Sequence, residues 1–230
     1  MHSKNQKPHK GAGMEGSVAR WYTRTRRNDM DEFRRQAQAV AKQLHPGSNV
    51  LEVAPGPGFF AIELAKLGDF RITGVDISRT FVEIAEGNAR VAGVKIDFRL
   101  GNASSLPFPG DSFDFIYCAA AFKNFSEPVK ALDEMCRVLR THGEALIADL
   151  RKDISLEELD TYLKNSGRSR FDAWLTKWIF RSTLIKRAYT KEQFLNMAEQ
   201  SRFGACQIRV SPIGYEVRFS KPPQLVAAAS

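Results

Sequence analysis

The sequence predicts an α/β fold in which a mostly parallel sheet carries helices on both of its faces. Between residues 49 and 150, short apolar strand-like segments alternate with segments whose apolar residues recur every three or four positions, as in helices. That alternation is typical of βαβ units, whose right-handed crossovers place helices on both faces of a parallel sheet. Near the C-terminus, two strand-like segments flank a short turn, which predicts an antiparallel hairpin closing one edge of the sheet.

The first part of the chain justifies this prediction element by element. His45-Pro46-Gly47 is expected to end a helix that begins at about residue 31, and Gly68 is expected to end a helix that begins at about residue 59. Ser78 is expected to cap the start of the next helix, which Gly93 is expected to end. Helices are expected at 31–44, 59–67, 78–91 and 127–139. Strands are expected at 49–53, 71–75, 95–99, 113–118 and 145–150.

Beyond residue 150 the pattern changes. The spacings Ser155–Glu158 and Thr190–Gln193 predict capping boxes at the starts of two helices. The expected elements are helices at 155–163, 171–185 and 190–197 and hairpin strands at 205–210 and 215–219. The organisation predicted from all elements is a flexible basic arm or lid at 1–28, a single domain at 29–220 with a helical insertion at about 151–190, and a tail at 221–230.

Composition narrows the class of protein. The chain has 230 residues, 43% hydrophobic and 26% charged, with a formal net charge of +8. Ten Lys and Arg against four Asp and Glu occur in 1–42, and ten against five in 151–191, so the positive charge lies in the two flanks. No apolar run approaches the ~18 residues of a membrane span. Three dispersed cysteines and a polar N-terminus without the apolar core of a secretory signal favour a soluble cytoplasmic protein with reduced thiols.

A glycine-rich turn carries the strongest functional signal. The first strand runs into Ala54-Pro55-Gly56-Pro57-Gly58, and the second ends in Gly74-Val75-Asp76. Such a turn lets a ligand approach the backbone at the carboxyl edge of the sheet. An acidic residue at the end of the next strand can accept hydrogen bonds from both ribose hydroxyls. Together these features predict a site for an adenosine-containing cofactor.

The turn alone also matches the G-x-G-x-x-A fingerprint of nicotinamide dinucleotide sites. Three features argue against that cofactor. Glu52 would be unfavourable beside a pyrophosphate and favourable beside a cationic ligand. Asn102, after the third strand, offers both a donor and an acceptor to an adenine edge. Finally, Asp111-x-Phe113-Asp114 opens the fourth strand, and the terminal hairpin replaces a second mononucleotide-binding half.

With these motifs in this order, the segment from about Ser48 to Leu150 resembles the class I S-adenosylmethionine (SAM)-dependent methyltransferases. The nearest resemblance is to the ubiquinone/menaquinone-biosynthesis group (methyltransferase type 11) and its small-molecule relatives. It implies a Rossmann-like, seven-stranded sheet with an antiparallel last strand, and it implies SAM as cofactor with S-adenosylhomocysteine (SAH) as product. The chain departs from the family pattern at Ala54, where glycine is usual, and at Thr141-His142-Gly143, where Pro-Gly-Gly is usual.

The resemblance implies two groups of cofactor residues. Glu52, Ala54, Gly56 and Gly58 would form the loop around the methionine part of SAM, and Ala119, after the fourth strand, would lie near the sulfonium.

At the other end of the cofactor, Asp76 would bind the ribose, and Ile77 would lie beside the adenine. Asn102, where the family more often has Asp, and Ala103 would contact the adenine edge.

Lys123 and Asn124 stand where many relatives carry a His-His pair, and they are the predicted catalytic residues. Lys123 would orient an anionic or phenolic acceptor, or lose its proton if desolvated. The competing interpretations are a solvated loop lysine and an asparagine that caps the next helix.

Five further residues are predicted on the lid or substrate side. Trp21 and Tyr22 would form the lid, and Phe122, Arg181 and Tyr189 would line the acceptor pocket. Packing onto the core is the competing interpretation for the first pair, and a solvated helix face is the competing interpretation for Arg181 and Tyr189.

The predicted function is transfer of the methyl group of SAM to a small aromatic or heteroaromatic metabolite at O, N or C. The alternatives are an RNA or protein methyltransferase, which the net charge suggests, a non-catalytic SAM-binding protein, and a nicotinamide oxidoreductase. The prediction includes no metal, no membrane span and no nucleic-acid partner. It leaves the oligomeric state open, with a homodimer as one option.

Overall fold

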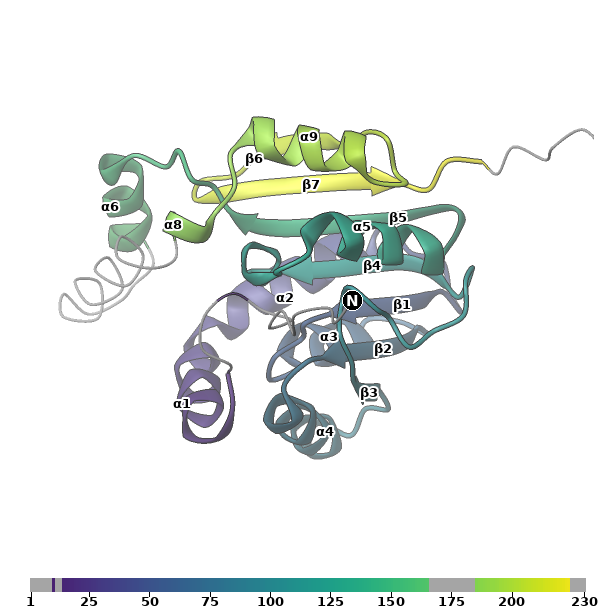
Figure 1. The fold of residues 1–230 in the computed structure, drawn as a ribbon. Helices are drawn as coiled ribbons and strands as arrows, with labels where there is room; N and C mark the ends of the chain where they lie inside the picture. The colour runs from purple at the N-terminus through teal and green to yellow at the C-terminus, as the bar shows by residue number, and fades with distance from the viewer. Residues whose placement is uncertain (1–9, 11–13, 166–184, 224–230) are drawn as a thin grey trace, which may run out of the picture.

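One seven-stranded sheet forms the centre of the molecule. The computed structural model describes residues 10, 14–165 and 185–223. The strand order is β3-β2-β1-β4-β5-β7-β6, with parallel pairing from β3 to β5 and antiparallel pairing of β7 to both β5 and β6 (Figure 1). The predicted fold class is therefore confirmed. The strands are β1 (Asn49–Val53), β2 (Arg71–Asp76), β3 (Asp97–Leu100), β4 (Phe113–Ala119), β5 (Leu139–Leu150), β6 (Gln207–Val210) and β7 (Gly214–Ser220).

Local sequence signals start several helices at the positions that their spacing predicts. The Ser78 hydroxyl accepts a hydrogen bond from the Phe81 amide, and Thr190 and Gln193 form a complete capping box. Ser155 and Glu158 bond to each other in the same reciprocal way. The helical segments are α1 (Gly16–Arg26), η1 (Arg27–Asp29), α2 (Met30–Ala41), α3 (Phe59–Ala65), α4 (Arg79–Ala92), η2 (Phe122–Asn124), α5 (Pro128–Val138), α6 (Leu156–Asn165), α8 (Ile185–Arg187) and α9 (Lys191–Gln200).

The two faces of the sheet bury separate apolar clusters. Successive side chains of a strand point to opposite faces. In β4, Phe115 and Tyr117 accordingly join the cluster formed with α2, α3 and α4, whereas Ile116 and Cys118 join the cluster formed with α5 and α9. Both faces of the central strands are covered by helices, which explains why most of their residues are apolar.

Two elements differ from the sequence-based expectation. Part of the predicted flexible arm at 1–28 is the helix α1, which packs against α4. The segment Thr141-His142-Gly143, which precedes the strand expected at 145–150, lies inside β5, where His142 adopts a positive φ of 64°. Leu139 pairs with Phe113 and Glu144 pairs with Phe115, so the segment lies in an irregularity of β5 between two paired positions. Local residue preferences do not report such pairing.

The predicted helix 171–185 falls almost wholly outside the described residues. Among the residues that the structure describes, no helix is both long enough and apolar enough to cross a membrane.

Candidate cofactor site and acceptor side

The candidate site lies where the strand order reverses. From β1 the chain proceeds outward to β2 and β3, and it then returns to the other side of β1 as β4. In open α/β sheets, ligands bind at the carboxyl ends of the strands that flank such a switch point. The arrowheads of β4 and β5 in Figure 1 point toward the side of the sheet where α1 and α8 lie.

Glu52 occupies the carboxyl end of β1 and is 5% exposed. Its carboxyl oxygen Oε2 accepts a hydrogen bond from the Ala61 amide at 3.2 Å, in the first turn of α3. Burial raises the pKa of Glu52 to about 8, and the nearby Asp76 raises it further, against the lowering effect of the Ala61 hydrogen bond. A cationic neighbour would therefore stabilise the ionised form of the Glu52 side chain.

Asp76 ends β2 and is held in place by the backbone of the glycine turn. Its Oδ2 accepts from the Gly56 amide at 3.0 Å, and its Oδ1 accepts from the Ser78 amide at 2.9 Å. Each carboxylate oxygen has a second acceptor position, so both remain able to accept a ligand hydroxyl. Burial raises the pKa of Asp76 to about 6, opposed by these hydrogen bonds, so the group is largely ionised at neutral pH.

The turn between these two carboxyl groups requires left-handed backbone at three positions. Ala54, Gly56 and Gly58 have φ values of 58°, 53° and 76°. A side chain at Gly58 would meet the Phe98 ring at 2.8 Å, so glycine is needed there for helix packing. Gly56 has no such crowding from the core, and the nearest neighbour of a Cβ at that position would be a Tyr22 ring carbon at 4.0 Å. Gly56 is therefore the position at which a ligand can approach the backbone.

Asn102 is the second residue of the connection from β3 to β4, and it forms a tight turn. Its Oδ1 accepts from the Ser104 amide at 3.0 Å, and its backbone carbonyl accepts from the Ser105 amide at 2.9 Å. The turn fixes the direction of the side-chain amide. Ala103 is half-buried beside it, and Ile77, directly after Asp76, is 39% exposed.

Lys123 has a different environment from the predicted one. It is 2% exposed, and its Nζ forms an ion pair with Asp149 Oδ1 at 2.8 Å and donates to the Ala120 carbonyl. The Lys123 amide donates to Asp149 Oδ2 at 2.8 Å. The lysine is thus neither a solvated loop residue nor a free amine facing an acceptor. It fastens the end of β4 to the end of β5.

One other acceptor-side expectation, for Phe122, and the competing interpretation for Asn124 also change. Phe122 is fully buried and packs against the rings of Phe125, Tyr189 and Phe194, so no acceptor can reach it without rearrangement. Asn124 does not cap α5, because the N-cap position is Glu127.

Polar atoms of several residues meet beside the end of β4. The Asn124 carbonyl accepts from the Lys10 amide at 2.7 Å, and Asn124 Oδ1 lies 3.4 Å from Arg187 Nη1. Lys10 Nζ donates to the Tyr189 hydroxyl at 2.7 Å. Ala119, the last residue of β4, is half-buried, and Ala120 follows it with a φ of 56°.

Helix α1 covers the glycine turn. Its Tyr22 ring packs edge-on against Phe81 at 5.8 Å between centroids. Glu15, just before α1, accepts from the Arg79 and Thr80 amides at the start of α4, at 3.0 and 3.1 Å. Trp21 is 53% exposed and lies on the outer face of α1, so only Tyr22 of the predicted lid pair faces the turn.

The structure adds residues that sequence reasoning missed. Asp149 is an acid near the end of an apolar strand, a signal that could have been read. Glu15 and Lys10 lie in the N-terminal segment, where no spacing marked them. Arg181 lies outside the described residues. Within the described part of the chain, no cluster of His, Cys, Asp and Glu is suited to a metal ion.

The chemistry of this site fits the cofactor that the resemblance implies. The buried carboxyl groups of Glu52 and Asp76 flank a glycine turn. Asp76 has free acceptor positions for hydroxyls, and a cation would stabilise the ionised form of Glu52. SAM carries ribose hydroxyls, an ammonium and a sulfonium.

Comparisons with known proteins agree with this geometry. Residues 51–147 match a family described as methyltransferase domain. The chain is 36% identical over 121 residues to a demethylmenaquinone methyltransferase of Deinococcus radiodurans, covering 52% of this chain and 50% of that protein. It is 41% identical over 157 residues to the uncharacterized methyltransferase YcgJ of Bacillus subtilis, covering 66% of this chain and 61% of that protein. The matches thus span about half to three fifths of these relatives.

Solved structures with low sequence identity share the fold. A candidate SAM-dependent methyltransferase of Methanococcus maripaludis has a TM-score of 0.74 at 19% identity, with 98% of this chain and 100% of that chain covered. A SAM-dependent methyltransferase of Aquifex aeolicus has a TM-score of 0.61 at 20% identity, with 80% and 89% covered. These structures show the fold, and the sequence matches confirm the resemblance found in the motifs.

Proposed function

We propose that this protein transfers the methyl group of SAM to a small aromatic or heteroaromatic acceptor at O, N or C, because residues 51–147 match a family described as methyltransferase domain. One observation carries the proposal: the glycine turn at the switch point lies between the buried carboxyl groups of Glu52 and Asp76. Relatives named for demethylmenaquinone or for ubiquinone/menaquinone biosynthesis support a small-molecule acceptor over RNA or protein.

The chain's own residues would hold the cofactor at three points. Asp76 would accept from the ribose hydroxyls through its unused acceptor positions, while the Gly56 amide keeps its carboxylate oriented. Glu52 would ionise beside the positive charge of the methionine part. Asn102 would meet the adenine edge. When bound, SAM supplies a methyl group already activated by the sulfonium.

The acceptor would lie beyond Ala119, beneath the polar group formed by Asn124, Tyr189 and Lys10. Alignment is the main contribution that such a displacement needs from the protein. Lys123 would act here by keeping the ends of β4 and β5 together. A direct catalytic role for Asn124 is part of the proposal, as are a cytoplasmic location and a small-molecule partner.

Calorimetric titration with SAH, with NADH in parallel, tests the cofactor class. We expect SAH to bind and NADH not to bind. Asp76→Ala should weaken SAH binding more than tenfold, because the ribose hydroxyls lose their acceptor. Asp97→Ala is the matched control, since Asp97 opens the neighbouring strand and forms a surface pair with Arg99.

Binding of NADH alone would overturn the proposal. Equal SAH affinity of Asp76→Ala and the wild type would remove the role of Asp76. After SAH binding is established, phenols, quinols and indoles are the acceptors to test for methylation.

A further inference from the structure

The connection from β3 to β4 depends on α5 for its shape. This connection, residues 101–112, contains Pro107 and Pro109, which have no amide hydrogen to donate. Its second half makes one short internal backbone bond, from the Phe108 amide to the Leu106 carbonyl at 2.8 Å, and Ser112 closes its end on the Pro109 carbonyl. Backbone groups in such a segment need partners from elsewhere in the fold.

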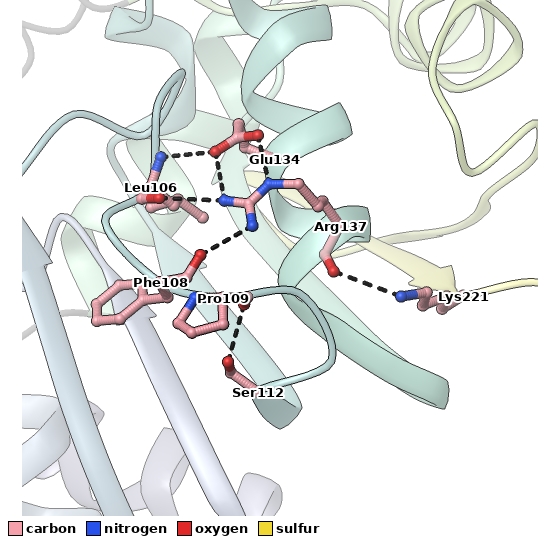
Figure 2. Close-up of polar contacts among 7 residues, drawn as sticks. All are labelled: Leu106, Phe108, Pro109, Ser112, Glu134, Arg137 and Lys221. Atoms are coloured by element: carbon pink, nitrogen blue, oxygen red, sulfur yellow. Dashed lines mark hydrogen bonds and ion pairs between the residues drawn. The ribbon is translucent and has the colours of Figure 1, made fainter.

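Two side chains of α5, one helical turn apart, supply those partners (Figure 2). Glu134 Oε2 accepts from the Leu106 amide at 2.8 Å. Arg137 donates to the Leu106 carbonyl at 3.1 Å and to the Phe108 carbonyl at 2.8 Å. The two side chains also form a bidentate pair, with N···O distances of 2.7 and 2.8 Å. We call Glu134 and Arg137 together the α5 clamp.

The clamp uses all three nitrogen atoms of the Arg137 guanidinium group. Nε and Nη2 face the Glu134 carboxylate, while Nη1 and Nη2 face the two carbonyls. A lysine has a single ammonium and cannot span these acceptors in one geometry. Lys221 fixes the backbone of the clamp from the other side by donating to the Arg137 carbonyl at 3.4 Å (Figure 2). Its Nζ also donates to Asp111 at 2.8 Å.

The clamped segment carries the residues proposed to meet adenine. Ser104 Oγ donates to the Glu127 carbonyl at the start of α5. The Asp111 and Ser112 amides donate to carbonyls of the last two residues of α5, at 3.2 and 2.8 Å, so α5 holds the connection at both ends. The Asn102 turn lies between these attachments and β3. The Ser104 amide donates to Asn102 Oδ1 and orients it. Asn102 Nδ2 has no hydrogen-bond partner among the residues that the structure describes.

We propose that Arg137, together with Glu134, is a positioning residue for the adenine end of the cofactor. By fixing the segment 101–112, the clamp presents the Asn102 side-chain amide to the ring edge, where Nδ2 donates to a ring nitrogen and Oδ1 accepts from the exocyclic amino group. This inference rests on the proposed function. It adds residues on α5, which does not itself touch the cofactor.

The experiment compares two ligands and three variants. SAH carries adenine, whereas S-inosylhomocysteine carries a 6-oxo group and a protonated ring nitrogen, so both hydrogen bonds to Asn102 are reversed. The wild type should prefer SAH by about tenfold, the range expected of one bidentate contact. Arg137→Lys should weaken SAH binding by about fivefold and reduce the preference by about threefold, because the clamp loses its fork.

Arg140→Lys is the matched control. Arg140 also forms a pair with a carboxylate, Asp114, but it contacts no backbone atom of the segment 101–112. Glu134→Gln is the second clamp variant. It keeps the side-chain volume. If Arg137→Lys does not fold, the ligand preference of Glu134→Gln tests the positioning role.

The outcomes separate the two proposals. Equal preference for adenine in the clamp variants and the wild type, with only a lower melting temperature, overturns the positioning role. A wild type that binds SAH without preferring it over S-inosylhomocysteine also overturns it, while the proposed function stands. A wild type that binds neither ligand overturns both.

Discussion

At the scale of single residues, burial decides what the candidate site can do. Glu52 and Asp76 are both 5% exposed, yet their environments give them different pKa values. The pKa of Glu52 is raised to about 8 and that of Asp76 to about 6. Asp76 receives two backbone amides and Glu52 one, which accounts for the direction of the difference. Near neutral pH the site therefore combines an ionised acceptor for hydroxyls with a protonated group that a cation would ionise.

This difference predicts a pH-dependent stability. The folded-state pKa of Glu52 is raised above its ordinary value of 4.5, so the folded protein holds a proton that the unfolded chain releases. The stabilisation is full below about pH 4.5 and is lost as the pH rises toward 8. The free energy of unfolding should therefore fall with pH, by at most about 1.4 kcal/mol per pH unit for each proton. Asp76 contributes only up to about pH 6.

Urea denaturation at pH 5 to 8 measures this slope. Glu52→Gln should flatten it between pH 6 and 8, whereas Glu83→Gln, at an exposed position of α4, should leave it unchanged. Identical slopes in the wild type and Glu52→Gln would show that Glu52 is not protonated in the folded protein.

A second residue-scale prediction concerns the buried pair of Lys123 and Asp149. Lys123→Met should lower the free energy of unfolding by about 3–5 kcal/mol, because it leaves the Asp149 carboxylate buried without its counter-charge. Lys123→Met combined with Asp149→Asn should recover part of the loss. Denaturant unfolding of the single and double variants is the measurement. A single variant within about 1 kcal/mol of the wild type would favour a lysine that is available to the acceptor.

At the scale of elements, the N-terminal segment is fastened across the carboxyl edge. Glu15 holds the start of α1 on the first turn of α4, and Ser78 donates to the Met14 carbonyl. Lys10 is attached on the far side, at Asn124 and Tyr189. A carboxylate at a helix N-terminus is also favoured by the helix dipole. Lys10 is thus attached on the β4 side of the switch point, and Glu15 is attached on the β2 side, at the start of α4.

Glu15→Ala should loosen this attachment. Tryptic cleavage within Arg20–Arg27 should become roughly tenfold faster, because charge-assisted bonds to two amides and the Thr80 hydroxyl are lost. Glu83→Ala, on the exposed face of α4, is the control for a simple loss of charge. An unchanged cleavage rate would mean that α1 is held by its apolar contacts alone.

At the scale of the whole molecule, the C-terminal part completes the sheet rather than forming a separate unit. β7 pairs with β5 along seven residue positions, from Glu144↔Ser220 to Leu150↔Gly214. The Phe194 ring of α9 meets the rings of Phe122 and Tyr215, so one apolar cluster joins the end of β4 to the last strands. The single domain over 29–220 stays a prediction, and an unfolding experiment tests it.

The continuity predicts one cooperative unfolding transition. Phe194→Ala should lower the free energy of unfolding by about 3–5 kcal/mol without splitting the transition, because Phe194 is fully buried in the shared cluster. Hydrogen exchange in peptides covering β1–β2 and β6–β7 measures it. Loss of protection in β6–β7 at lower denaturant than in β1–β2 would argue for two units.

The sequence by itself determined the features that depend on local patterns. Period-two and period-3.6 apolar spacing located the central strands and helices, and the caps at Ser78, Ser155 and Thr190 form as their spacing predicted. The glycine turn and the acid at the end of β2 marked the cofactor site, because each signal lies within a few residues of chain.

Only the tertiary structure decided what depends on a distant partner. Lys123 is withdrawn from the acceptor side by Asp149, 26 positions further along the chain, and Trp21 faces outward because Tyr22 packs on Phe81. The α5 clamp joins Arg137 to a carbonyl 31 positions away. No local spacing encodes such pairings, since they form only when the sheet brings strand ends and helices together, and the free energy of burying each group depends on that arrangement.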